Sequence, residues 1–258
     1  MINAPRINAR RRRVFVLLAL PLFALGLNTN VLAQQPAPTE PTAGAAPPPY
    51  FDPKTLDLGR LLPPAPTNDS DITRGEIERM LKIQKERSPA EAQRAADDAK
   101  VTIYRFSDAL GNPIVFNAKS LPKFDTLFRK VLHEEGAVVQ AGKRSFKRPR
   151  PFVIEPRIQP VVDKPPNESY PSGHTMWART VGLLLSDMVP EFRGAIMARA
   201  DEYSFNRVVA GVHYPSDVDA GKLAGTALAA FLFASPAFQA DYEDAKKELR
   251  AALKLPPV

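Results

Sequence analysis

Three short clusters of polar residues between positions 143 and 217 carry side chains that could do chemistry. Together they offer three cations, one carboxylate, a glycine and two of the three histidines in the chain. The clusters are Lys143, Arg150 and Pro151; Pro171, Ser172, Gly173 and His174; and Arg207, His213 and Asp217. Fixed cations beside imidazole groups suit the binding and attack of a tetrahedral oxyanion. The clusters therefore predict hydrolysis of a phosphate ester with a histidine as the nucleophile.

The second cluster predicts an anion site at the start of a helix. Residues 171–174 stand directly before the apolar run 177–185, so Ser172 and Gly173 should lie at a helix N-terminus. The first N–H groups of a helix have no partner inside it, and the helix dipole favours negative charge there. Gly173 has no Cβ, so the backbone can approach a ligand closely. His174 on the first turn is then placed to protonate the leaving alcohol as general acid.

The third cluster predicts an oriented histidine nucleophile. Pro215 is a typical first residue of a helix, which leaves His213 in the incoming loop and puts Asp217 on the first turn. A carboxylate four residues after a histidine can accept a hydrogen bond from one ring nitrogen and present the other for attack. Arg207, near the end of the preceding helix, is expected to reach the bound anion.

Lys143 and Arg150 complete the expected cradle for the anion. The guanidinium of Arg150 matches two phosphate oxygens at once, and Lys143 adds a point charge. The neighbouring basic residues Arg144, Lys147 and Arg148 are interpreted as a solvated rim that attracts anions.

Helix signals follow one another along the chain, with almost no strand signal. Thr73 with Glu76, and Ser88 with Glu91, match the capping-box pattern, and Ser120 precedes an amphipathic run. The expected helices span about 73–87, 89–101, 121–132, 173–188, 190–205, 215–233 and 236–253. The prediction is an all-α fold: a single compact domain of about seven or eight helices, with the active site at helix N-termini and loops.

The two ends of the chain differ in composition. Five arginines within residues 1–13 supply most of the net charge of +7, since 7 − 5 leaves +2, so the charge gives no reason to expect a nucleic-acid partner. A basic start and an apolar run at 14–27 predict that residues 1–33 are a cleaved secretory signal, with an uncleaved anchor as the weaker alternative. We therefore expect a periplasmic protein, exported by the general or the twin-arginine route, with no stable membrane partner.

The remaining composition bounds the architecture and the cofactors. Residues 34–62 are rich in proline and form a largely flexible lead-in, although the apolar residues from 50 to 62 favour packing against the domain, which spans 63–258. The chain has no cysteine, which excludes disulfides, a thiol nucleophile and zinc-thiolate sites. His133, Glu134 and Glu135 lack the spacing of a metal motif, so no metal and no cofactor are expected.

The spacing within the clusters resembles a three-part signature. Its elements are Lys143-x6-Arg150-Pro151, then Pro171-Ser172-Gly173-His174, then Arg207-x5-His213-x3-Asp217. This pattern resembles the superfamily of type 2 phosphatidic acid phosphatases and vanadium haloperoxidases, and within it most closely the class A bacterial non-specific acid phosphatases. The resemblance covers roughly residues 63–253.

The resemblance implies a role for each residue of the signature. His213 would form a phosphohistidine supported by Asp217, and His174 would act as the acid. The phosphate would be bound by the remaining five residues: Lys143, Arg150, Ser172, Gly173 and Arg207. Two departures from the family pattern stand out. Asn206 replaces the usual serine before the arginine and should modulate the shape beside the phosphate. His133 occupies the register of an upstream acidic residue that supports the acid histidine, which leaves the support of His174 open.

Three other functions remain compatible with the same residues. The cradle could hold vanadate and oxidise halides, it could act on lipid phosphates, or it could bind phosphate without turnover. The leading prediction is hydrolysis of small-molecule phosphate monoesters with broad specificity, inhibited by vanadate or phosphate. A homo-oligomer is compatible with the sequence, which does not name the physiological ester or the pH optimum.

Overall fold

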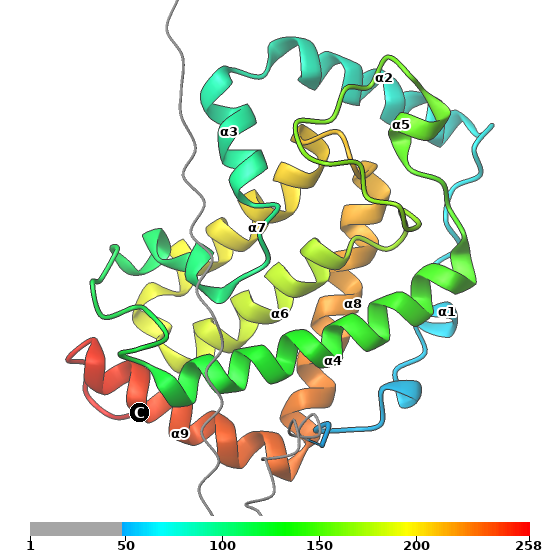
Figure 1. The fold of residues 1–258 in the computed structure, drawn as a ribbon. Helices are drawn as coiled ribbons and strands as arrows, with labels where there is room; N and C mark the ends of the chain where they lie inside the picture. The colour runs from blue at the N-terminus through cyan, green and yellow to red at the C-terminus, as the bar shows by residue number, and fades with distance from the viewer. Residues whose placement is uncertain (1–47) are drawn as a thin grey trace, which may run out of the picture. The chain divides into compact units, whose positions relative to one another are not determined.

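The computed structural model describes residues 48–258, and all regular secondary structure in this part of the chain is helical (Figure 1). The predicted export segment and residues 34–47 of the lead-in lie outside the described residues. The α-helices are α1 (Leu58–Leu61), α2 (Asp71–Glu86), α3 (Pro89–Asp97), α4 (Pro122–Phe146), α5 (Pro151–Ile154), α6 (Gly173–Met188), α7 (Arg193–Val209), α8 (Pro215–Ala234) and α9 (Pro236–Ala252). Short 3₁₀ helices span Pro53–Thr55, Ile103–Phe106, Asp108–Leu110 and Pro190–Phe192. The prediction of an all-α fold is confirmed.

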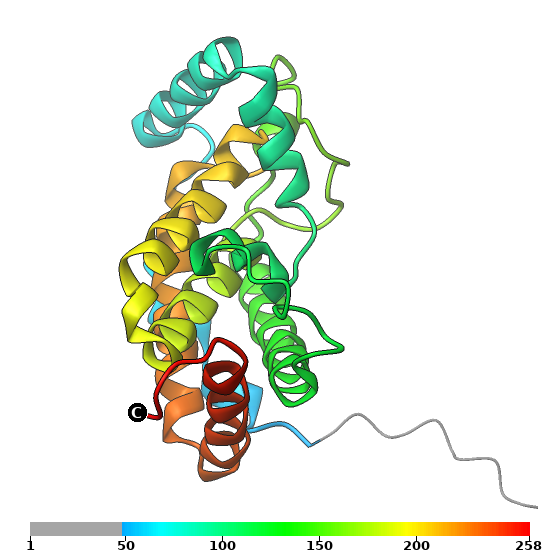
Figure 2. The ribbon, with the colours of Figure 1, turned by 90° about the vertical axis from the view of Figure 1, so that its left-hand side faces the viewer.

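Helix α6 is the centre of the arrangement. It packs most extensively against α7 and α8 and also contacts α4, and in Figure 1 it runs between α4 and α7. Most of its residues beyond the first turn are buried, and the more exposed ones, Arg179, Leu183 and Asp187, follow one another at steps of four on a single face. Helices α2 and α3 lie at one end of this unit and α9 at the other, as Figure 2 also shows.

The N-terminal halves of α6 and α8 approach each other closely because α8 has glycine where they meet. A Cβ atom at Gly221 would lie 2.6 Å from the carbonyl oxygen of Ser172, and one at Gly225 would lie 2.4 Å from that of Met176. Any larger residue would push the helices apart. This contact brings the second and third polar clusters of the sequence together.

Local signals predicted some helix ends and missed others. The capping box of Ser88 and Glu91 is present as predicted. The one predicted at Thr73 and Glu76 is wrong, because Ser70 caps α2 and Glu76 bonds elsewhere. Helix α4 begins after Leu121 without a cap from Ser120 and continues to Phe146. Lys143 therefore lies on a helix, and not on a loop as expected for the polar clusters.

The segment before α2 packs against the helices. Tyr50, Leu56, Leu58 and Leu62 are buried in the same core as α4 and α9. The Tyr50 hydroxyl donates to Asp241 on α9 at 2.7 Å. The chain from residue 50 onward thus contributes to the packed unit.

Within residues 48–258, no individual helix combines the length and apolar character needed to cross a membrane. Helices α8 and α9 meet that requirement only as a pair, and they are bent by 96° where they join.

Candidate active site

One cavity of about 390 Å³ gathers six of the eight residues that the sequence predicts for the site. These six are Lys143, Arg150, Gly173, His174, Arg207 and His213. They come from the last turn of α4, the segment before α5, the first turn of α6, the end of α7 and the loop before α8. The remaining two residues, Ser172 and Asp217, lie behind the wall of the cavity.

His213 is held by a partner at each ring nitrogen. Its Nδ1 lies 3.2 Å from Asp217 Oδ2, and its Nε2 lies 2.8 Å from Arg150 Nη1. A guanidinium can only donate, so Nε2 must accept and the ring hydrogen must be on Nδ1. Burial and the nearby Arg150 hold the pKa of His213 well below its usual value. The imidazole is therefore neutral, and the lone pair of Nε2, which accepts from Arg150, lies beside the cavity.

Asp217 is fixed by several donors besides His213. Its carboxylate accepts from the Ser169 hydroxyl, from the backbone N–H of Tyr214 at 2.9 Å and from Arg148 Nη1 at 2.7 Å. Its own carbonyl oxygen accepts from Ser172 N at 3.0 Å. The residue that orients His213 is thus tied through its backbone to Ser172, at the start of α6.

Arg148 is the main residue of this site that sequence reasoning missed. The sequence predicts that it belongs to a solvated rim, and this prediction is wrong, because Arg148 is only 3% exposed. Its guanidinium also donates to Glu76 Oε2 at 2.9 Å, to Thr73 Oγ1 at 3.2 Å and to a serine hydroxyl on α8 at 2.7 Å. The spacing of two residues between Arg148 and Arg150 could have indicated that Arg148 is buried, because residues two apart in an extended segment face the same side.

The three cations of the cavity are strongly desolvated. Lys143 Nζ donates to two backbone carbonyls, at 2.6 and 3.1 Å, and burial lowers its pKa to about 7. Arg150 donates to Asn167 and to the Val212 carbonyl, and burial lowers its pKa to about 10.

The guanidinium group of Arg207 has hydrogen-bond donors that an anion could use. Within residues 48–258, its Nε and Nη1 atoms are buried and have no hydrogen-bond partner. Burial also lowers its pKa to about 10. An unpartnered buried donor is costly, especially when it is charged, so an anion in this cavity would satisfy it.

The start of α6 presents Gly173 to the cavity and keeps Ser172 behind it. Ser172 caps the helix: its hydroxyl oxygen accepts from Thr175 N at 3.3 Å and from Thr175 Oγ1 at 3.0 Å. Its side chain is fully buried, and it does not line the cavity. Ser172 therefore supports the terminus of α6 as its cap.

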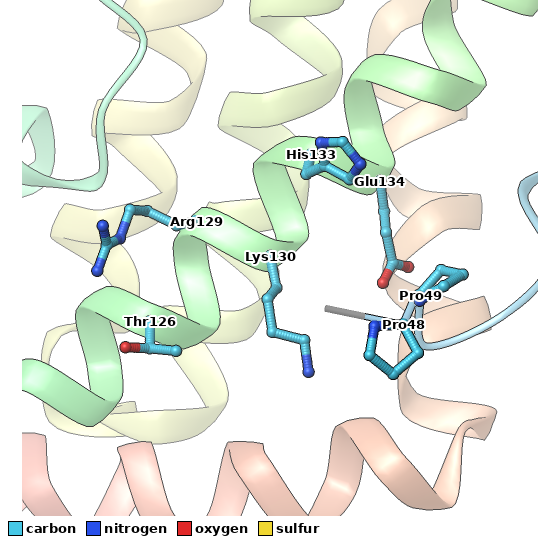
Figure 3. A pocket seen from close by; sticks show the side chains of 7 residues that line it. All are labelled: Pro48, Pro49, Thr126, Arg129, Lys130, His133 and Glu134. Carbon is cyan, nitrogen blue, oxygen red and sulfur yellow. The ribbon is translucent and has the colours of Figure 1, made fainter. Parts of the chain in front are cut away.

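His174 is oriented by a backbone carbonyl. Its Nε2 lies 3.0 Å from the oxygen of Ala99, which can only accept, so Nε2 carries a hydrogen. Burial and the charge of Arg207 lower the pKa of His174 to about 3. A bound dianion would offset the cations and favour the protonated ring. His133, which occupies the register of the family's supporting acid, lies in a different cavity (Figure 3).

Asn206 does not lie beside the expected phosphate position. Its side-chain amide donates to Asp98 Oδ2 at 2.7 Å, and it is absent from the cavity wall. The expectation that it shapes the cavity directly is wrong, because Asp98 draws its side chain toward α3. Within the described residues, no group of three potential metal ligands occurs.

Comparison with known proteins gives the family. The family model described as PAP2 superfamily matches residues 131–240. The non-specific acid phosphatase of Salmonella typhimurium is 33% identical over 73% of this chain and 78% of its own length. That of Providencia stuartii is 30% identical over 89% of this chain and 96% of its own length.

The chain belongs to the PAP2 superfamily and, within it, to the non-specific acid phosphatases. The resemblance carried by the three motifs is thereby confirmed. A solved bacterial vanadium-dependent iodoperoxidase has the same fold, with a TM-score of 0.54 and 18% identity. That alignment covers 68% of this chain and 52% of the iodoperoxidase.

Proposed function

We propose that this protein hydrolyses phosphate monoesters of varied alcohols through a phosphohistidine on His213. The observation that carries the proposal is the tautomer of His213, whose unprotonated Nε2 faces a cavity that also holds three desolvated cations. The names of the relatives, non-specific acid phosphatases, agree with this activity.

In the first step, the phosphate group of the ester binds among Lys143, Arg150 and Arg207. A phosphate oxygen takes over the donor of Arg150 that now faces His213, which frees Nε2 for attack on phosphorus. The P–O bond to the alcohol breaks as the N–P bond forms, and protonated His174 gives its proton to the leaving oxygen. Positioning and charge stabilisation supply most of the catalysis in phosphoryl transfer.

In the second step, water attacks the phosphohistidine. Neutral His174 accepts a proton from the water, the N–P bond breaks, and the lone pair returns to Nε2. Asp217 stabilises the His213 ring throughout, because its carboxylate holds the Nδ1 hydrogen. Inorganic phosphate then leaves, and the same site would bind phosphate or vanadate as inhibitors.

The wall of the cavity supports broad specificity for the alcohol. Apart from the groups assigned to the phosphate, it includes the apolar side chains of Val101, Val139 and Trp177. Such a surface accommodates alcohols by contact area and selects weakly among them. Three protein cations supply the charge that metal ions provide in other phosphatases, so we propose that the reaction is independent of metal ions.

We further propose that the protein works in the periplasm. The basic and apolar composition of residues 1–33 supports an export signal. The proline-rich lead-in of 34–62 follows, and from Tyr50 onward it packs on the phosphatase domain of 63–258.

The test is release of p-nitrophenol from p-nitrophenyl phosphate in the presence of EDTA. Wild-type protein should be active, and the His213→Ala variant should be reduced to background. His133→Ala is the matched control, since this histidine lies outside the cavity, and it should keep wild-type activity. Inactive wild-type protein, or an active His213→Ala variant, would overturn the proposal. Halide oxidation after vanadate loading would point to the haloperoxidase alternative.

A further inference from the structure

Glu135 is a buried carboxyl group in the active-site cavity to which the mechanism above gives no task. It lies on α4, two turns before Lys143 and one turn before Val139, so the three side chains share the helix face that lines the cavity. Glu135 is 5% exposed. Its position opposite the start of α6 places it among the groups that would surround a bound ester.

One oxygen atom of this carboxyl group is left without a partner among the described residues. Within residues 48–258, Glu135 Oε1 is buried and has no hydrogen-bond partner. A Cβ atom at position 173 would lie 3.4 Å from this oxygen, so the carboxyl group sits against Gly173, where the anion site is expected. A native protein rarely leaves such a group unpaired unless a ligand completes it.

Two opposing influences decide its ionisation. The charged groups that face the cavity are Lys143 from α4, Arg150 from the segment before α5, Arg207 from α7, and the histidines 174 and 213 when protonated. Their cations favour the carboxylate. Burial outweighs them and raises the pKa of Glu135 to about 8. The dianion of a phosphate ester would favour the neutral form further.

We propose that Glu135 is a substrate-binding residue whose protonated carboxyl group donates a hydrogen bond to an oxygen atom of the phosphate ester. The proposal rests on the proposed function and adds a fourth side-chain donor to the cradle, one that carries no charge. An ionised Glu135 would instead repel the ester oxygens. Binding is therefore strongest below the pKa of Glu135 and weakens as the pH rises through it, which gives the site a preference for acid.

The first test compares Glu135→Gln with Glu135→Ala. Glutamine keeps a donor of the same length and cannot ionise. At pH 6 it should keep kcat/KM for p-nitrophenyl phosphate within about threefold, whereas alanine should lose roughly 10- to 100-fold. Between pH 7 and 9 the wild type should lose affinity for inorganic phosphate more steeply than Glu135→Gln. The Glu135 carboxylate raises the pKa of Lys143, so its removal would make Lys143 lose its charge at lower pH, which acts in the opposite sense. A steeper loss in the wild type therefore reports Glu135 itself.

Glu134 provides the matched control. It is the adjacent buried glutamate on α4, it accepts from Tyr50 N, and it lines the other cavity with Pro48 and Pro49 (Figure 3). Glu134→Gln should leave kcat/KM and the pH dependence of phosphate binding unchanged. An alanine variant at 135 with wild-type kcat/KM at pH 6 would overturn the proposal. So would a glutamine variant as impaired as the alanine variant, because that result requires a carboxylate.

A spectroscopic test does not depend on turnover. At pH 6 the infrared spectrum of the wild type should contain a protonated-carboxyl band that is missing from Glu135→Gln. This band should disappear as the pH of the ligand-free protein rises through about 8, and inorganic phosphate should preserve it to higher pH. Absence of the band from the wild type at pH 6 would contradict the proposal. The result stands whether or not the wild type hydrolyses esters, so the two proposals can fail separately.

Discussion

Replacing Arg148 by methionine removes the guanidinium that lies between two buried carboxylates. Arg148 donates to Asp217 Oδ1 at 2.7 Å and to Glu76 Oε2 at 2.9 Å, and its guanidinium carbon lies 3.8 Å from the centre of the Tyr214 ring. Methionine fills much of the same volume without the charge. The variant is therefore a probe of the electrostatic support that Asp217 receives.

The expected magnitudes follow from these contacts. Breaking a buried ion pair on one side costs about 3–5 kcal/mol of folding stability. A hydrogen bond to a charged group contributes about 1.5–3 kcal/mol, so losing the one to Asp217 should reduce kcat/KM roughly 10- to 150-fold if it acts fully on the transition state. The cation also favours the ionised form of Asp217. Without it, the pKa of Asp217 rises, and the acid limb of kcat/KM should move to higher pH.

The assay is the pH profile of p-nitrophenyl phosphate hydrolysis at a temperature where each variant is folded by circular dichroism. Arg148→Lys should recover part of the lost activity, because lysine restores the positive charge but not the planar set of guanidinium donors. Arg144→Met is the matched control, since this arginine is exposed, and it should resemble the wild type. A folded Arg148→Met protein with wild-type kcat/KM and an unshifted acid limb would refute the positioning role.

Three further predictions concern residues around the cavity. Arg207→Met should weaken the binding of inorganic phosphate at least tenfold, as measured by calorimetry. The melting temperature without phosphate should stay equal or rise, because the substitution removes buried donors that have no partner. A lower melting temperature with unchanged phosphate binding would contradict this prediction. Gly225→Ala should lower the free energy of unfolding in urea by at least about 1 kcal/mol, since the new Cβ would lie 2.4 Å from the Met176 carbonyl oxygen. A variant as stable as the wild type would argue against the close contact of the two helices. Asn206→Ser should lose about 1 kcal/mol of stability with its bond to Asp98 and change kcat/KM less than threefold; a larger kinetic change would place residue 206 at the phosphate.

Features that depend on neighbouring residues in the chain could be predicted from the sequence. The cap of Ser88 by Glu91 and the pairing of His213 with Asp217 each span three or four positions, and both are present. The all-α class followed from the same local signals. The motif spacing also identified the six residues that meet at the cavity, although the spacing along the chain does not give their distances in space.

Contacts between distant parts of the chain could not be predicted in this way. Glu76 matched a capping box locally but accepts from Arg148 instead, 72 residues away, because a buried guanidinium outweighs a surface cap. The support of His174 is a backbone carbonyl, that of Ala99, which no side-chain pattern encodes. The burial of Glu135 depends on the packing of α4 beside α6. The local sequence therefore does not distinguish Glu135 from an exposed glutamate on a helix.

The proposed mechanism requires that His213 Nε2 becomes bonded to phosphorus during turnover. Rapid mixing with a ³²P-labelled ester, an alkaline quench and tryptic digestion should place an acid-labile label on the peptide of residues 208–222, which contains His213. The label should disappear when unlabelled substrate is chased through and should be missing from His213→Ala. A label on the peptide that carries His174, or turnover by the wild type with no labelled peptide at any mixing time, would contradict this mechanism.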